Sequence, residues 1–189
     1  MKKHFAEHLH ENVYDSQIDD ASEALNILPT DTVSIKLRPV RTNDNNEYEN
    51  AYASGWDYKD FKNYLKTKQS DFADVDIDNN SALITTNDGN KIFYIEHESG
   101  PEFIFDVTMK AIEFVTVVGG LILIISELMK KNDDKRHKPE TGKNRIEAIS
   151  IEERKKGKKT KVTKIIRIDG VDKIDLTSTE IKNLLKKLK

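Results

Sequence analysis

Cysteine is absent from the 189 residues of this chain. Its absence excludes disulfide bonds, thiolate nucleophiles and cysteine-ligated zinc sites, and it is typical of a cytoplasmic protein. The first residues, MKKHFAEHLHEN, carry two lysines but no apolar run behind them, so we expect no secretory signal. Together these absences predict a cytoplasmic location.

Recognisable catalytic motifs are also missing. The sequence contains no glycine-rich phosphate loop, no serine elbow and no pair of carboxylates that can be assigned as catalytic. We therefore expect no catalytic, cofactor-binding or metal-binding residues, and we expect that the protein is not an enzyme. Two weaker patterns have to be weighed against this expectation.

The first pattern is the segment HFAEH, which has the H-x-x-E-H order of a zinc-peptidase motif. On a helix, His4 and His8 would share one face, and Glu7 would act as a base. The motif begins at residue 4 with no scaffold before it to hold the geometry, and chain termini are usually mobile. We expect an exposed terminus here and no zinc site.

The second pattern is the segment DVDIDNN, which opens with the spacing of a calcium-binding loop: Asp74, Asp76 and Asp78 alternate with apolar residues. The pattern then fails, because Asn79 stands where the loop needs glycine and Thr85 where it needs a bidentate glutamate. We expect an acidic loop that precedes a strand.

An uncharged run long enough for an ordinary membrane span is lacking as well. The most apolar stretch is Ala111–Lys131, AIEFVTVVGGLILIISELMKK, in which Glu113 and Glu127 bracket an uncharged run of 13 residues. A span needs about 20 residues, and a run of about 10–14 is more often a buried helix. We therefore predict one long hydrophobic central helix over about 101–131.

Polar residues in and around this stretch recur at helical spacing, which favours a helix with one solvent-facing seam. They are Asp106, Lys110, Glu113, Thr116, Gly120, Glu127 and Lys131. The adjacent Gly119 and Gly120 predict that another backbone or a bulky side chain packs closely on this helix.

A membrane-spanning helix stays open as the alternative. Lys130, Lys131 and further basic residues follow the apolar run directly, as in a positive-inside flank. The alternative is a single inner-membrane span over about 111–129, with the C-terminus in the cytoplasm.

Capping and turn signals divide the rest of the chain into short elements. The N-terminal part predicts a helix from Ser16 that Pro29 ends, a strand over Thr32–Val40, a polar loop over 41–55 and a short helix after Asp57. The later part predicts a hairpin over 81–97 with its turn at Asn87–Asn90, a second hairpin over 145–170 with its tip near Gly157, and a C-terminal helix opened by Thr177 and Glu180.

These elements predict an α+β fold in which two β-hairpins form a sheet packed on the long central helix, with smaller N-terminal and C-terminal helices. We expect residues 1–80 to form an acidic region of helix, strand and loop. We expect residues 81–189 to form an α+β domain that contains the central helix, a basic C-terminal hairpin and the last helix.

Charge is distributed unevenly along the chain. Residues 1–129 carry 11 lysines and arginines against 23 acidic residues, whereas residues 130–189 carry 20 against 10. The candidate anion or partner contacts lie around the tip of the second hairpin: Arg154, Lys155, Lys156, Lys158, Lys159 and Lys161. Lysines at such a tip suit phosphates, an acidic protein or anionic lipid, but they also occur on solvated turns that protect a sheet edge.

From about residue 81 to the end, the order is hairpin, hydrophobic helix, hairpin with a charged tip, and short helix. This layout resembles the effector-associated constant component domains of bacterial conflict systems. The resemblance rests on element order and hydropathy, covers a little over half of the chain and transfers no motif residue. It implies a non-enzymatic adaptor that accompanies an effector.

The sequence therefore predicts a non-enzymatic binding or adaptor module with a protein partner and no cofactor. One alternative is the single-span membrane protein with a cytoplasmic basic C-terminal domain. The other is a nucleic-acid-binding protein without sequence preference that uses the basic hairpin.

Overall fold

A computed structural model describes residues 4–11, 16–50, 58–97, 100–136, 143–156 and 158–171, together with Asn183 and Lys186, both helical. The strands are β1 (His4–Glu11), β2 (Thr32–Thr42), β3 (Tyr48–Asn50), β4 (Asp74–Ile77), β5 (Ser81–Thr85), β6 (Lys91–His97), β7 (Gly100–Asp106), β8 (Lys143–Lys156) and β9 (Lys158–Val171). The helices are α1 (Ser16–Leu25), α2 (Tyr58–Thr67), α3 (Ala111–Thr116) and α4 (Val118–Arg136), with short 3₁₀ turns η1 (Pro29–Asp31) and η2 (Gln69–Asp71).

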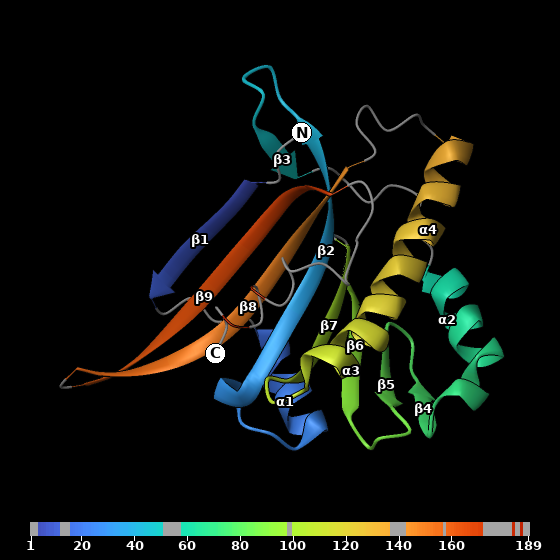
Figure 1. Cartoon of the computed structure of the whole chain (residues 1–189), viewed down its shortest axis with the longest axis horizontal. Coiled ribbons are helices and arrows are strands. Elements are labelled where there is room, and N and C mark those ends of the chain that lie inside the picture. Colours follow the sequence, from blue (N-terminus) through green and yellow to red (C-terminus); the bar gives the residue numbers. More distant parts are fainter. Residues whose placement is uncertain are drawn as a thin grey trace.

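All nine strands belong to one antiparallel sheet, so the fold is α+β as predicted (Figure 1). The strand order is β1-β9-β8-β2-β7-β6-β5-β4, and β3 pairs with the end of β2. Strands from residues 1–80 lie among strands from residues 81–189, and β2 separates β7 from β8. Strands from both of the expected regions, residues 1–80 and 81–189, therefore share one sheet.

The predicted single helix over about 101–131 is wrong in its first part, because residues 100–106 form the central strand β7. Along this strand Phe103 and Phe105 occupy one face and Ile104 the other, which is the period of a strand rather than of a helix. Helix begins only at Ala111, and it is divided into α3 and α4. Because the whole stretch is apolar, its sequence does not show where the period of a strand changes to the period of a helix.

Several local predictions are confirmed. Helix α1 begins at Ser16 as expected, but it ends at Leu25, and Pro29 opens η1 instead of ending the helix. Helix α2 begins directly after Asp57, and β5 and β6 form the hairpin around residues 86–90. The second hairpin is also confirmed, since β8 ends at Lys156 and β9 begins at Lys158. Strand β2 continues past Pro39 to Thr42, and β3 lies in the segment that was expected to be a loop.

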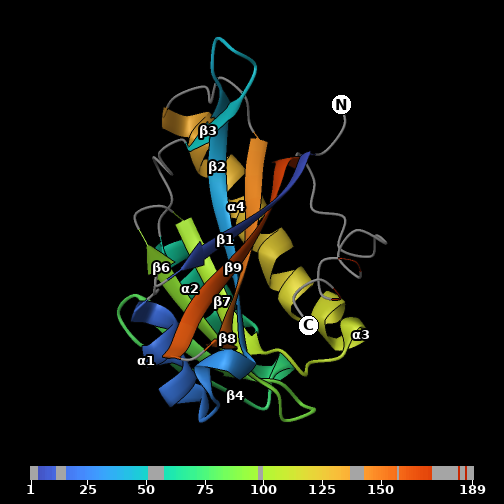
Figure 2. The same ribbon diagram turned by 90° about the vertical axis from the view of Figure 1, so that its left-hand side faces the viewer.

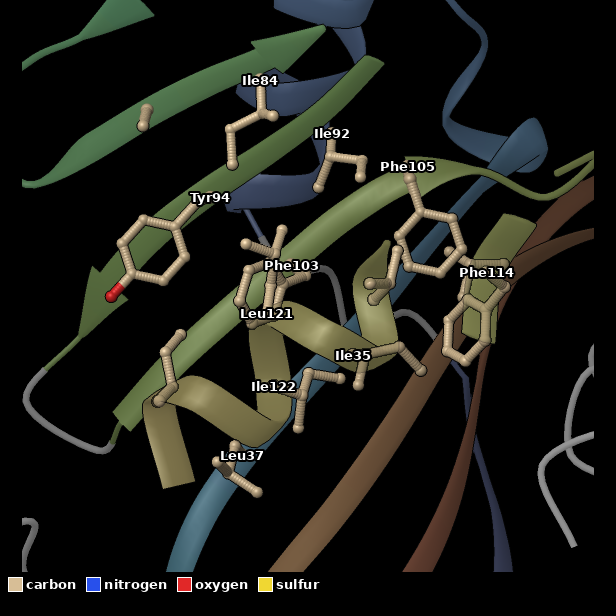
Figure 3. Packing of buried hydrophobic residues seen from close by; sticks show 14 of the residues in the cluster. Ile35, Leu37, Ile84, Ile92, Tyr94, Phe103, Phe105, Phe114, Leu121 and Ile122 are labelled. Atoms are coloured by element: carbon tan, nitrogen blue, oxygen red, sulfur yellow. The ribbon is translucent and has the colours of Figure 1, made fainter. Parts of the chain in front are cut away.

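One face of the sheet is covered by α2, α3 and α4, and the other by α1 (Figures 1 and 2). On the first face, Phe103 and Phe105 of β7 pack with Leu121 and Ile122 of α4 (Figure 3). Phe61 of α2 packs on Tyr94 of β6 in the same core, and the centroids of these two rings are 4.6 Å apart. On the second face, Ala21 and Leu25 of α1 cover Ile104.

Helix α2 also carries a tyrosine whose pKa is raised, Tyr64. The ring of Tyr64 stacks on Phe61 with centroids 6.0 Å apart. Burial raises the pKa of the Tyr64 hydroxyl above 10.0, and the nearby Asp71 carboxylate raises it further. Tyr64 therefore stays protonated throughout the neutral range.

Helix α4 buries one side on the sheet through Val118, Leu121, Ile122 and Ile125. Among the described residues, no helix is long and apolar enough to cross a membrane. The predicted close packing at Gly120 is wrong, because a Cβ added there meets no atom within 4 Å.

Gly100 is the glycine whose replacement the fold resists most. Its φ is +116°, and an added Cβ would collide with the carbonyl oxygen of Leu37 on β2. The substitution Gly100→Ala therefore combines backbone strain with a clash against a fixed strand. We expect it to lower the free energy of unfolding by roughly 2–3 kcal/mol in chemical denaturation.

Gly120→Ala is the matched control for this change. Gly120 lies inside α4 with open space around it, so alanine should raise the free energy of unfolding by up to about 1 kcal/mol. Equal effects of the two substitutions would contradict the close approach of β7 to β2 at Gly100.

Candidate functional site

A cluster of charged and polar side chains is buried in the centre of the sheet, on the face that α1 covers. We call it the buried ion cluster. Its buried members are Ser34 and Lys36 of β2, Glu102 of β7, and Arg145 and Glu147 of β8. Arg38 of β2 and His97 of β6 belong to it as half-buried members. Lys36 is the register partner of Glu102 on one side and of Glu147 on the other. A lysine therefore lies between two carboxylates from neighbouring strands.

Glu102 receives most of the contacts within this cluster, and it is 0% exposed. The Nζ of Lys36 lies 3.4 Å from Glu102 Oε2, and the Nε2 of His97 lies 2.6 Å from the same oxygen. The hydroxyl of Ser34 donates a hydrogen bond to Glu102 Oε1. Because a buried carboxylate is costly without partners, these three donors explain how Glu102 is tolerated at this depth.

The second carboxylate, Glu147, is paired with Arg38. Their Nε and Oε2 atoms are 2.6 Å apart, which is ion-pair distance. The Nε–H of Arg38 has no hydrogen-bond acceptor with acceptable geometry among the described residues, so this contact is electrostatic rather than a well-directed hydrogen bond. Since Glu102 and Glu147 are both almost completely inaccessible, we assign the cluster a structural role.

Sequence reasoning missed this cluster, although part of its signal is visible. In TVSIKLRPV the polar positions Ser34, Lys36 and Arg38 alternate with apolar ones, and RIEAIS repeats that alternation with Arg145 and Glu147. The partner of Lys36 on β7, Glu102, could not be recognised, because the sequence predicts a helix over the residues around Glu102. Pairing of β2 with β7 and β8 joins residues that are far apart in the sequence, so none of the three segments predicts it alone.

The predicted contact residues lie on a projecting part of the second hairpin, which we call the hairpin arm (residues 153–156 and 158–161). Pairing of β8 with β2 ends at Ser150, and pairing of β9 with β1 ends at Val162. Beyond these points, the described strands of the arm pair only with each other. The arm leaves the body of the molecule as a two-stranded ribbon at the lower left of Figure 1.

All six candidate residues are brought together on this arm. The register places Lys155 opposite Lys159, and Lys156 opposite Lys158. Because neighbouring positions of a strand alternate between faces, one face holds Arg154, Lys156 and Lys158 and the other Lys155, Lys159 and Lys161. Like charges directly opposite each other destabilise a ribbon, so the arm is a place of electrostatic repulsion.

The opposite end of the sheet is acidic. Edge strand β4 exposes Asp74 and Asp76 on one face while Val75 is buried, and among the described residues it pairs only with β5. The expected acidic loop before a strand is therefore wrong, since Asp74–Ile77 is itself a strand. Charges on an edge strand discourage pairing with another sheet.

The zinc-like motif at the N-terminus also lies on a strand rather than on a helix. In β1, Glu7 occupies the opposite face from His4 and His8, and these histidines are about 13 Å apart along the strand. Within the described part of the chain, no group of three or more histidine, aspartate or glutamate residues could hold a metal ion.

Two open hollows lie near α1. The larger, of about 440 Å³, is lined by Ser22, Glu23, Asn26, Ile27, Leu28 and Asp31. The smaller, of about 270 Å³, is lined by Leu25, Ile27, Gly89, Asn90, Lys91 and Asp106. Neither hollow contains a member of the buried ion cluster or of the hairpin arm.

Comparison with known proteins gives no relative to guide the assignment. No protein-family model matches the chain, and no curated protein or solved structure matches it at a significant level.

The buried ion cluster predicts a large stability effect at Glu102. Glu102→Gln removes the charge that compensates Lys36 at a buried site, so we expect the free energy of unfolding to fall by about 3–5 kcal/mol. Asp71→Asn is the matched control, because Asp71 forms an exposed ion pair with Lys68 at 3.8 Å. That change should cost less than about 1 kcal/mol.

The double variant Lys36→Met with Glu102→Leu should be more stable than Glu102→Gln, because it removes both charges and leaves apolar side chains in their place. Chemical denaturation measures all three variants. A cost at Glu102 no larger than that at Asp71 would show that the cluster does not hold the sheet.

Proposed function

We propose that the protein is a non-enzymatic binding module of the adaptor type and that the hairpin arm is its contact element. The observation that carries this proposal is the projection of six basic residues on a ribbon beyond all neighbouring strands. The arm contains no apolar residue that could extend the hydrophobic core, and its like charges repel one another. A contact function accounts for both properties.

The electrostatics of the arm select the partner. A negatively charged surface that approaches the arm relieves the repulsion between opposed lysines. This relief makes the free energy of binding to an anionic partner more favourable. The rest of the chain favours one orientation, because outside the arm it has 7 more acidic than basic residues. An acidic body and a basic arm steer an anionic partner towards the arm.

An adaptor also needs a second surface, and the sheet offers one. The acidic edge strand β4 is separated from β8 by β2, β7, β6 and β5. A partner at β4 and a partner at the arm would therefore not compete for the same surface. The resemblance to effector-associated domains of bacterial conflict systems agrees with this arrangement, and it makes an effector protein the proposed companion.

Capture experiments test the arm as the contact element. The tagged protein is compared in a lysate of its native host with the variant Lys155→Gln/Lys156→Gln/Lys158→Gln/Lys159→Gln, followed by quantitative mass spectrometry. We expect specific partners to be lost from this variant by about tenfold or more, because the contacts are charge-dependent. The temperature of thermal unfolding should not fall, since turn lysines are normally solvated and the change removes the repulsion between opposed lysines.

The matched control removes the same charge elsewhere. Lys59, Lys66, Lys68 and Lys91 are exposed and lie outside the arm, so their replacement by glutamine should leave capture intact. Loss of the same partners from both variants would contradict the assignment to the arm and would indicate an effect of net charge alone.

A further inference from the structure

We propose that the anionic partner of the hairpin arm is duplex DNA and that the arm enters the major groove. This inference rests on the proposed function of the arm as the contact element. It adds the class of partner and the mode of contact. Shape, the distribution of charge on the ribbon and the charge of the body all lead to it.

The shape of the arm matches the groove. Two antiparallel strands lie about 4.8 Å apart, and the major groove of B-form DNA, about 12 Å wide, admits a two-stranded ribbon. The arm extends four residues past the last strand partner, from Glu153 to Lys156, which is about 13 Å of chain. This length exceeds the groove depth of about 8.5 Å, so the tip can reach the base edges while the body stays outside.

The distribution of charge distinguishes a groove from a flat surface. Both faces of the ribbon carry three basic positions each, which are Arg154, Lys156 and Lys158 on one face and Lys155, Lys159 and Lys161 on the other. The second face also holds Glu153 opposite Lys161, so both faces stay net basic. A membrane or an acidic protein surface would meet only one face and leave the other in solvent. A groove has phosphates along both walls, so both faces of the ribbon meet negative charge.

The body of the molecule limits the contact to the arm. Outside the arm, the chain carries 32 acidic residues against 25 basic ones, so phosphates repel the rest of the chain. Residues 145–171 contain no aromatic side chain that could stack on bases, which favours a duplex over a single strand. Lysine contacts to phosphates carry no sequence information, so we expect binding with little sequence preference.

Fluorescence anisotropy with a labelled DNA duplex tests this inference on the intact protein. If four basic side chains neutralise phosphates, affinity should fall about 150-fold between 50 and 200 mM salt. The variant with glutamine at Lys155, Lys156, Lys158 and Lys159 should lose this binding and its salt dependence. Arginine at the same four positions should restore both, and the control variant at Lys59, Lys66, Lys68 and Lys91 should bind like the unmodified protein.

A blocked groove tests the mode of contact. A duplex of the same sequence with glucosylated 5-hydroxymethylcytosine keeps its phosphates but fills its major groove, and it should bind about tenfold more weakly or worse. Duplex RNA should also bind weakly, because its major groove is deep and narrow. Equal affinity for the blocked and unblocked DNA would overturn insertion into the groove.

The outcomes separate this inference from the proposed function. Absence of duplex binding at 50 mM salt, or equal binding by vesicles rich in phosphatidylserine, would overturn the assignment to DNA. If capture of a host partner still requires the four lysines, the arm remains the contact element and its partner is a protein. If neither DNA binding nor capture depends on them, both proposals fall.

Discussion

The position of Lys36 between two carboxylates is the constraint on which the centre of the sheet depends. Its partners, Glu102 and Glu147, come from β7 and β8, which are far apart in the sequence and lie on either side of β2. A shift of β2 by one residue would turn Lys36 towards α4 and bring Ile35 or Leu37 into the ion cluster. Because both outcomes bury unpaired charge, one register is strongly favoured.

The two faces of β2 thus have different structural roles. One face presents Ile35 and Leu37 to the aromatic layer under α4, and the other presents the ion cluster. The apolar face supplies most of the stabilisation, because burial of large side chains contributes more than ion pairs do. The polar face selects which strands lie next to β2. Because the polar face places β8 next to β2, it also sets the direction in which the hairpin arm leaves the body.

What could be read from the sequence depended on the range of each interaction. Signals within a few residues predict the correct elements, such as the turn around Gly89 and the hairpin in which β8 ends at Lys156 and β9 begins at Lys158. The strand β7 was misread because a short apolar run with Phe103 and Phe105 has no period that excludes a helix when its neighbours are also apolar. The buried ion cluster could not be predicted, because its members come from four strands whose order is set by packing.

Pairing of β1 with β9 makes the fold strongly non-local. The register joins His4 to Asp169, so almost the whole chain separates two residues that are neighbours in the sheet. Folding rates fall as the mean sequence separation of contacts rises, since the entropy of closing a long loop is lost before the contact forms. During synthesis, β1 therefore leaves the ribosome long before its partner strand exists. We expect slow completion of this edge, with β9 exposed as an edge strand that is paired only with β8 until β1 adds to it.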